Sequence, residues 1–229
     1  MISRNAVSID VVKIQARLRA LGYKDKVIDG IFDPITENYV KQFQKKNGLY
    51  VDGIVGPNTA SLLVKLTRDK HLFTIIHCSA TPEGRGIKAE TVLRYHTITK
   101  KWSRPGYSDI LELNGNLVNI RPYNSDNLIQ NWEYTFGVKG ALVMNKNSRH
   151  VCYIGGTDKN GNAKDTRTIR QKDSLETYIK YEILRNPDVL ILGHNQLQYK
   201  ACPSFNVPNW MYDIKCSSKN YLTTELKKV

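Results

Sequence analysis

The stretch GHNQLQYKACPSF (residues 193–205) decides the fold together with IIHCSAT (residues 75–81). Each contains a histidine, His194 in the first and His77 in the second, and an apolar run typical of a buried β-strand comes just before it. Cys202 lies in a loop long enough to fold back over the end of its strand. A catalytic zinc ion takes three such ligands and keeps a fourth position for water. The sequence therefore predicts a zinc (Zn2+) site made by His77, His194 and Cys202.

Lys200 lies two positions before Cys202. If this segment is extended, alternate side chains point the same way, so the Lys200 ammonium would lie beside the metal. A cation there can stabilise the negative charge that develops when water adds to an amide carbonyl. The spacing thus favours the chemistry of amide hydrolysis.

Both stretches resemble the zinc N-acetylmuramoyl-L-alanine amidases of the type 2 family, in the branch of coliphage lysozymes. The family motifs HCSAT and KACPSF stand here unchanged at residues 77–81 and 200–205, and the strand VCYIGG (residues 151–156) matches as well. The resemblance extends from about residue 72 to about residue 213. It implies that Tyr107, which follows a glycine as in the family, and Lys200 are the catalytic residues of a peptidoglycan hydrolase. The bond cut would be the amide between N-acetylmuramic acid and L-alanine.

The chain departs from the family pattern after Tyr107, where a histidine and an aromatic residue are usual and Ser108 and Asp109 stand instead. Two other readings remain open. Related proteins of this fold bind wall fragments without cutting them, although such receptors typically lack the cysteine ligand, and Cys202 is present. A bacterial autolysin, or an endopeptidase that cuts inside the stem peptide, is the second alternative.

The formal net charge of +13 predicts attraction to polyanions. Bacterial walls are anionic, which suits peptidoglycan as the partner. Nucleic acid is not expected, because no basic motif interleaved with aromatic residues occurs. No apolar run approaches the ~18 residues of a membrane helix, so we expect no membrane insertion, and we expect a monomer. The first residues lack the apolar segment of a signal peptide, which predicts accumulation in the cytoplasm. In this respect the chain resembles phage endolysins, and the resemblance implies accumulation in the host cytoplasm and action on the wall after the membrane is permeabilised.

An internal repeat organises the N-terminal part, where IDGIFDPIT (residues 28–36) recurs as VDGIVGPNT (residues 51–59). Each copy combines an Asp-Gly turn with a proline at the expected start of a helix. The pattern QxxLxxLGY (residues 15–23) and these two turns resemble the widespread peptidoglycan-binding domain of wall hydrolases. We therefore expect this part to bind the cell wall and to carry no catalytic residue.

Hydrophobic periodicity predicts three helices in the N-terminal part, at about residues 10–21, 34–46 and 57–66. Leu21 and Leu62 are expected among their inward-facing residues. The later elements are expected to be strands before the two site histidines and at 151–154, a hairpin around Asn114-Gly115, and helices at 89–100 and 169–184.

This order predicts an α+β fold, with a small three-helix N-terminal bundle followed by a mixed β-sheet amidase domain with flanking helices. The expected domains are residues 1–66 and residues 72–229. The linker between them is short and charged, so we expect the bundle to stay close to the catalytic domain and to raise the local substrate concentration by tethering.

The remaining histidines and cysteines are expected to lie outside the site. Cys78 alternates with His77 along its strand, so its side chain should point to the opposite face and into the core. Cys152 lies in an apolar run and should be buried as well, whereas Cys216 lies in a polar stretch and is either free or exposed. We expect no role in the site for His71, His96 and His150.

Overall fold

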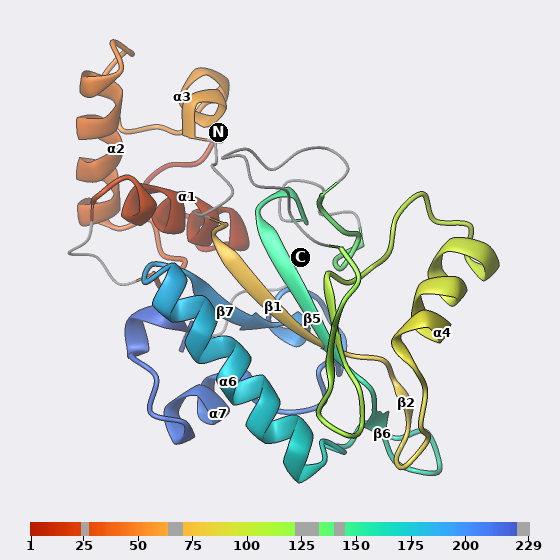
Figure 1. Cartoon of the computed structure of the whole chain (residues 1–229). Helices are drawn as coiled ribbons and strands as arrows, with labels where there is room; N and C mark the ends of the chain where they lie inside the picture. Colours follow the sequence, from red (N-terminus) through yellow and green to blue (C-terminus); the bar gives the residue numbers. More distant parts are fainter. Residues whose placement is uncertain (24–27, 64–70, 122–132, 140–144, 224–229) are drawn as a thin grey trace.

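The computed structural model describes residues 1–23, 28–63, 71–121, 133–139 and 145–223, and it has the α+β architecture predicted from the sequence (Figure 1). A five-stranded mixed sheet forms the centre, in the order β4-β3-β5-β1-β7. All neighbouring pairs are parallel except β3 and β4, which form the expected hairpin. The strands are β1 (Phe73–Cys78), β3 (Asp109–Leu111), β4 (Leu117–Asn119), β5 (Ser148–Tyr153) and β7 (Leu190–Gly193).

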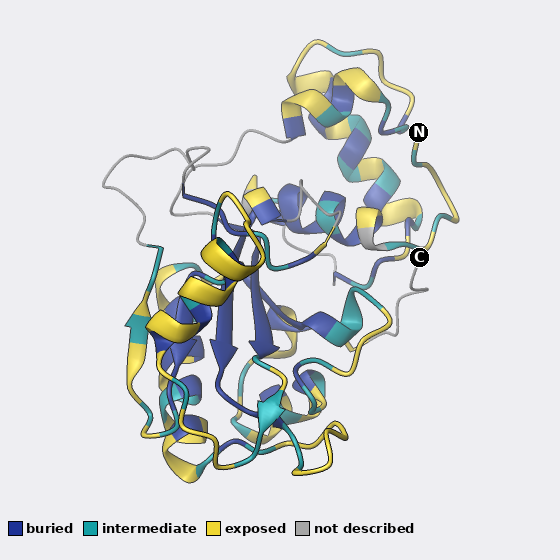
Figure 2. Cartoon of the chain, turned by 90° about the vertical axis from the view of Figure 1, so that its right-hand side faces the viewer, coloured by how far each residue is buried: buried dark blue, intermediate teal, exposed yellow. Residues whose placement is uncertain are grey.

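Helices cover both faces of the sheet, which explains why β1 and β5 are buried along their whole length (Figure 2). On one face, α6 (Ile169–Arg185) and α7 (Val207–Asp213) pack against the strands. On the other face, α4 (Ala89–Arg94) packs against β3 and β5 and continues as a π-helical segment, Tyr95–Thr99. Two short strands, β2 (Thr81–Pro82) and β6 (Gly156–Thr157), pair beyond the end of the sheet.

The parallel pairing brings the ends of β1 and β7 to the same edge of the sheet. In the register of the two strands, Ile76 pairs with Gly193. His77 therefore follows on β1 at the level where His194 leaves β7. A short 3-10 helix, His194–Gln196, then turns the chain across this edge.

The N-terminal part contains α1 (Ile9–Ala20), α2 (Pro34–Lys46) and α3 (Pro57–Leu63) at the predicted positions. The side chain of Asp33 accepts a hydrogen bond from the Thr36 N–H and caps α2, as a helix start of this type requires. The prediction for Leu21 and Leu62 was wrong, because both are exposed. Leu21 follows the last residue of α1, and Leu62 shares the short α3 with Leu63, which takes the inward position.

Two buried glutamines explain the repeat, because each holds one Asp-Gly turn against a helix. Gln44 in α2 donates to Asp52 Oδ1 at 2.8 Å and to Thr59 Oγ1 at 3.2 Å, and it accepts from the Gly53 N–H at 2.9 Å. Gln15 in α1 makes the same contacts with the first turn: Asp29 Oδ1 at 2.9 Å, Thr36 Oγ1 at 3.1 Å and the Gly30 N–H at 2.9 Å. The second Asp-Gly turn also needs its glycine, because Gly53 has a φ of 77° and lies against α2.

Replacing Gln44 with leucine should therefore destabilise the protein by about 3 kcal/mol, because the turn would keep several buried polar groups without partners. Urea denaturation followed by circular dichroism would measure this loss. Gln42→Leu on the same helix is the matched control, since Gln42 is exposed and its replacement should change the free energy of unfolding little. Equal effects of the two changes would contradict the role given to Gln44.

The helix α1 has two apolar sides. Val11, Ile14 and Leu18 face the core of the bundle. Val12 and Ala16 pack instead against the central sheet, in a cluster that joins both parts of the chain. The other buried members of this cluster are Ile28, Leu72, Phe73, Ile75, Val138, Leu190, Leu192 and Leu222. The bundle thus shares a hydrophobic core with the sheet, which is a closer association than a tether.

A hydrogen bond from the Arg19 guanidinium to the Lys219 carbonyl oxygen also joins the two parts. The expected domain boundary falls mainly on residues 64–70, outside the described residues, so the division into residues 1–66 and 72–229 stays a prediction. Within the described residues, none of the helices has the length and apolar character needed to cross a membrane.

Candidate metal centre

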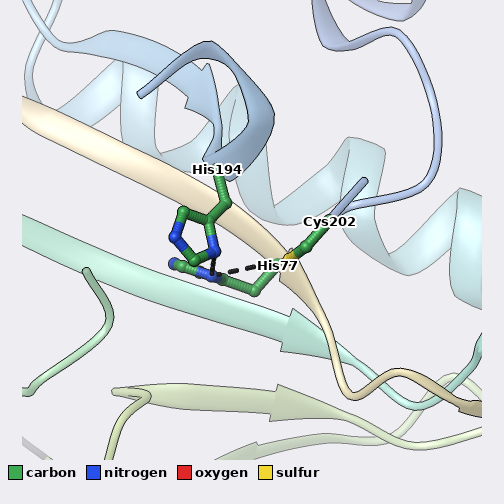
Figure 3. A group of neighbouring side chains, drawn as sticks. All are labelled: His77, His194 and Cys202. Carbon is green, nitrogen blue, oxygen red and sulfur yellow. Dashed lines mark hydrogen bonds between the residues drawn. The ribbon is translucent and has the colours of Figure 1, made fainter. Parts of the chain in front are cut away.

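Three side chains converge at the edge where β1 and β7 end (Figure 3). One ligand atom from each of His77, His194 and Cys202 lies within 4.8 Å of the other two. His77 Nδ1 is 3.2 Å from His194 Nδ1 and 3.7 Å from Cys202 Sγ. The structure thus brings together the three residues that the sequence motifs suggested as metal ligands.

The His194 ring is oriented by Gln198. The side-chain oxygen of Gln198 lies 3.0 Å from His194 Nε2. Its amide nitrogen donates to the Lys139 carbonyl at 2.9 Å, which fixes which end of the amide faces the histidine. Because an amide oxygen only accepts, His194 carries its proton on Nε2. The lone pair on Nδ1 is therefore directed at the three-residue group.

Both histidines of this group are held in the neutral form that metal binding would require. Burial lowers the pKa of His77 well below its usual value, and the neighbouring His194 and His150 lower it further. Burial also lowers the pKa of His194. Neutral imidazoles are good ligands, so the local electrostatics favour the metal over the proton.

The sulfur of Cys202 accepts a hydrogen bond from the Cys78 backbone N–H at 3.2 Å. The two thiols also hydrogen-bond each other and titrate as a pair. Their hydrogen bond lowers the pKa of Cys78 below the ordinary cysteine value and raises the pKa of Cys202 above it. A bound cation would direct the ionisation to Cys202, because only that thiol belongs to the three-residue group. Cys78 itself is buried among residues of the opposite face, as expected from its position beside His77.

Two imidazole nitrogens and one thiol sulfur, with a backbone N–H on the sulfur and fixed ring orientations, form a donor set that fits a divalent metal ion with nitrogen and sulfur ligands. These three residues therefore fit the zinc ion that the sequence motifs imply. Carboxylates are not part of this group in the described residues.

A cavity of about 560 Å³ opens beside His194, one of the three converging residues. This volume lies within the range of small-molecule sites, roughly 300–1,000 Å³. The lining residues include His194 together with both residues that the motifs suggested as catalytic, Tyr107 and Lys200. The other lining residues are Trp102, Gly106, Phe136, Gly137, Val138, Lys139 and Asn145.

Tyr107 lies against His77, one of the three converging residues. Its ring centroid is 5.1 Å from that of His77. Burial raises the pKa of Tyr107 well above its usual value, and the nearby thiols of Cys152 and Cys202 act in the same direction. The phenol therefore keeps its proton and can donate a hydrogen bond into the cavity. Lys200, by contrast, is exposed on the cavity wall.

Two histidines that we expected to be bystanders contact the site. His96 Nδ1 accepts from the Gly106 N–H at 3.3 Å, and its ring stacks on Trp102 and meets Tyr107 edge-on. His150 lies 2.9 Å from His77, measured between His150 Nδ1 and His77 Nε2. Only the parallel register, in which His150 pairs with Ile75, shows that the His150 side chain shares a face with His77.

His71 is the third of these histidines, and its Nε2 lies 3.0 Å from Oε2 of the buried Glu182, away from the group of three residues. Burial raises the pKa of Glu182, but the hydrogen bond and charge of His71 outweigh it, so this pKa lies below its usual value. The pair connects α6 to the residues before β1. His71 is thus structural, in agreement with the sequence-based expectation.

Comparison with known proteins gives matches for both parts of the chain. Residues 8–63 match the family model described as a putative peptidoglycan binding domain. The endolysin of Escherichia phage T7 is 27% identical over 135 residues, which cover 59% of this chain and 82% of that protein. A spore cortex-lytic enzyme of Bacillus cereus is 40% identical over 68 residues, 30% of this chain and 26% of that enzyme.

Among solved structures, an endolysin of a Thermus scotoductus bacteriophage superposes with a TM-score of 0.49 and 17% identity, over 67% of this chain and 91% of that one. This likeness is too loose to add to the sequence matches. The match to the putative peptidoglycan binding domain lies within the N-terminal helical part, and the match to the T7 endolysin covers more than half of the chain. The chain is thus similar to phage endolysins, and its residues 8–63 match a putative peptidoglycan binding domain.

Proposed function

We propose that this protein is a peptidoglycan hydrolase of the phage endolysin type, and that it is a zinc-dependent N-acetylmuramoyl-L-alanine amidase. The observation that carries the proposal is the convergence of His77, His194 and Cys202, together with a cavity that His194 lines along with Tyr107 and Lys200. The similarity to the T7 endolysin supports the same class of activity. The N-terminal match to a putative peptidoglycan binding domain supports the wall as the substrate.

When bound, zinc would activate a water molecule and polarise the carbonyl of the scissile amide. Residues of the chain itself would stabilise the charge that develops during the reaction. The Lys200 ammonium stabilises the negative charge that develops on the carbonyl oxygen, and the protonated Tyr107 hydroxyl donates a hydrogen bond to the reacting group. His194 and His77 are held neutral by burial, so neither competes as a cation for the same oxygen.

Replacing Lys200 with alanine should lower kcat on purified sacculi roughly a hundredfold, because a preorganised charge next to the reacting oxygen is lost. Zinc content should stay unchanged, since Lys200 is outside the ligand set. Lys159→Ala serves as a control, because Lys159 is an exposed lysine in the loop after β6 and should have no effect. Loss of zinc in the Lys200 variant would contradict the role we give it.

The type of bond cut separates this proposal from its alternatives. Sacculi digested by an amidase release stem peptides that begin with a free L-alanine amino group, while the glycan strands stay intact. Mass spectrometry of the soluble products would show this. Peptides cut within the stem would indicate an endopeptidase, and the absence of any soluble product would indicate a receptor. The presence of Cys202 in the ligand set favours the enzyme over the receptor.

A further inference from the structure

His150 sits directly behind the metal centre and takes no part in its ligand set. It lies on β5, is fully buried, and contacts His77 on the neighbouring strand through a hydrogen bond of 2.9 Å between His150 Nδ1 and His77 Nε2. His77 Nδ1 is the atom that faces His194 and Cys202. The two nitrogens of His77 thus have different partners, His150 on one side and the metal ligands on the other.

This arrangement fixes the protonation of both rings. If His77 Nδ1 is to bind a metal ion, its lone pair must be free, so the proton of His77 resides on Nε2. That Nε2–H then donates to His150 Nδ1, and His150 carries its own proton on Nε2. Metal-binding histidines generally need such an acceptor, which sets the tautomer and the ring orientation. His150 supplies it here.

Other contacts hold the His150 ring in place. The backbone N–H of His150 donates to Ser108 Oγ at 3.3 Å, and its carbonyl accepts from the Ser108 N–H at 2.8 Å. Gly137 lies flat against the ring, because a Cβ built at Gly137 would be 2.0 Å from His150 Nδ1. Any larger residue at position 137 would push the ring away from His77.

A structural role alone does not account for this histidine. His150 Nε2 is buried and has no hydrogen-bond partner among the described residues. A buried polar atom without a partner is unfavourable, and an apolar side chain of similar size would avoid that penalty. The retained imidazole is explained by what its other nitrogen does for His77.

We propose that His150 is a positioning residue of the metal centre, which accepts a hydrogen bond from the His77 Nε2–H and so orients His77 Nδ1 towards the ion. Gly137 leaves the space that the His150 ring needs for this contact. The inference rests on the proposed metal centre. It assigns no chemistry to His150, which does not touch the substrate.

Zinc affinity of the metal-free, full-length protein tests the proposal without reference to activity. Titration against a chromophoric chelator should show that His150→Leu raises the Kd for zinc roughly 10- to 100-fold. The midpoint of urea denaturation of the metal-free protein should change little, because the variant removes the unpaired His150 Nε2 but leaves the buried His77 Nε2–H without its acceptor. A merely structural residue would give the reverse, a lower midpoint with unchanged zinc affinity, and that result would overturn the proposal.

Two further variants sharpen the test. Asparagine places an acceptor oxygen near the position of Nδ1, so His150→Asn should keep a zinc Kd close to that of the wild type, whereas the leucine variant should not. Gly137→Ala should weaken zinc binding like His150→Leu, and the double variant should be no weaker than either single one, because both changes remove the same contact. Additive effects, or no rescue by asparagine, would contradict the assignment.

His96→Leu is the matched control. His96 is also a buried histidine near the cavity, but it contacts Tyr107 and Gly106 and none of the three ligands, so its loss should leave the zinc Kd unchanged. The outcomes also separate this inference from the proposed function. A wild type that binds zinc but leaves sacculi intact would refute the amidase and leave the positioning role standing. Tight zinc binding by His150→Leu would refute the positioning role alone.

Discussion

Replacing Cys202 with serine should abolish the digestion of sacculi and lower zinc affinity by at least about a hundredfold. A serine hydroxyl is a far poorer zinc ligand than a thiolate, and two histidines alone do not complete a catalytic site. The sulfur also accepts the Cys78 backbone N–H, which stabilises its negative charge. Zinc analysis of the purified variant and the rate of sacculus clearing would measure both effects.

The matched control is Cys216→Ser, because Cys216 is a partly buried free thiol outside the group of three ligands. Its replacement should leave both zinc content and activity near the wild type. The same pattern should follow from metal removal. Excess chelator should inactivate the wild type, and added zinc should restore it but should not restore Cys202→Ser. Full activity of the serine variant in the presence of chelator would be incompatible with a zinc centre at this position.

The second large effect concerns α1. Val12→Asp should destabilise the whole protein by at least about 3 kcal/mol, because it places a charge without a partner in the core shared by the bundle and the sheet. Thermal unfolding followed by circular dichroism, together with limited proteolysis, would show whether the two parts unfold together. The control Leu21→Asp introduces the same charge at an exposed position next to the same helix and should have little effect.

The outcome also decides how the bundle serves the enzyme. If it were only a tether, Val12→Asp would unfold the bundle and leave the catalytic part intact and active on small soluble muropeptides. We expect instead that both parts unfold in a single transition, because Phe73 and Leu190 of the central strands lose the apolar contacts of the shared core. Survival of an active catalytic part would contradict the shared core.

The sequence predicted the strands before His77 and His194 because a fully buried parallel strand is a continuous apolar run, which can be read without any knowledge of pairing. It could not predict the neighbours of these strands. The role of His150 depends on β5 lying beside β1 in one particular register, and that pairing joins segments far apart in the chain. Considered alone, a histidine at the start of an apolar run carries no such information.

In the N-terminal helical part, too, the sequence predicted local features but not the contacts between distant segments. The repeat predicted both Asp-Gly turns and the helix starts, since turn residues and caps act locally. The contacts of Gln15 and Gln44 with those turns were missed because each glutamine reaches from a preceding helix to a later turn. Likewise, periodicity selected one apolar side of α1, whereas Val12 belongs to a second side that only the docked sheet explains.

The most direct test of the account is a titration of the metal-free protein with zinc while new L-alanine amino termini released from sacculi are counted. We predict that the rate rises from zero and saturates at about one equivalent of zinc per chain, since the three ligands form a single site. Release of the same amino termini by the metal-free protein, or zinc saturation without any release, would contradict it.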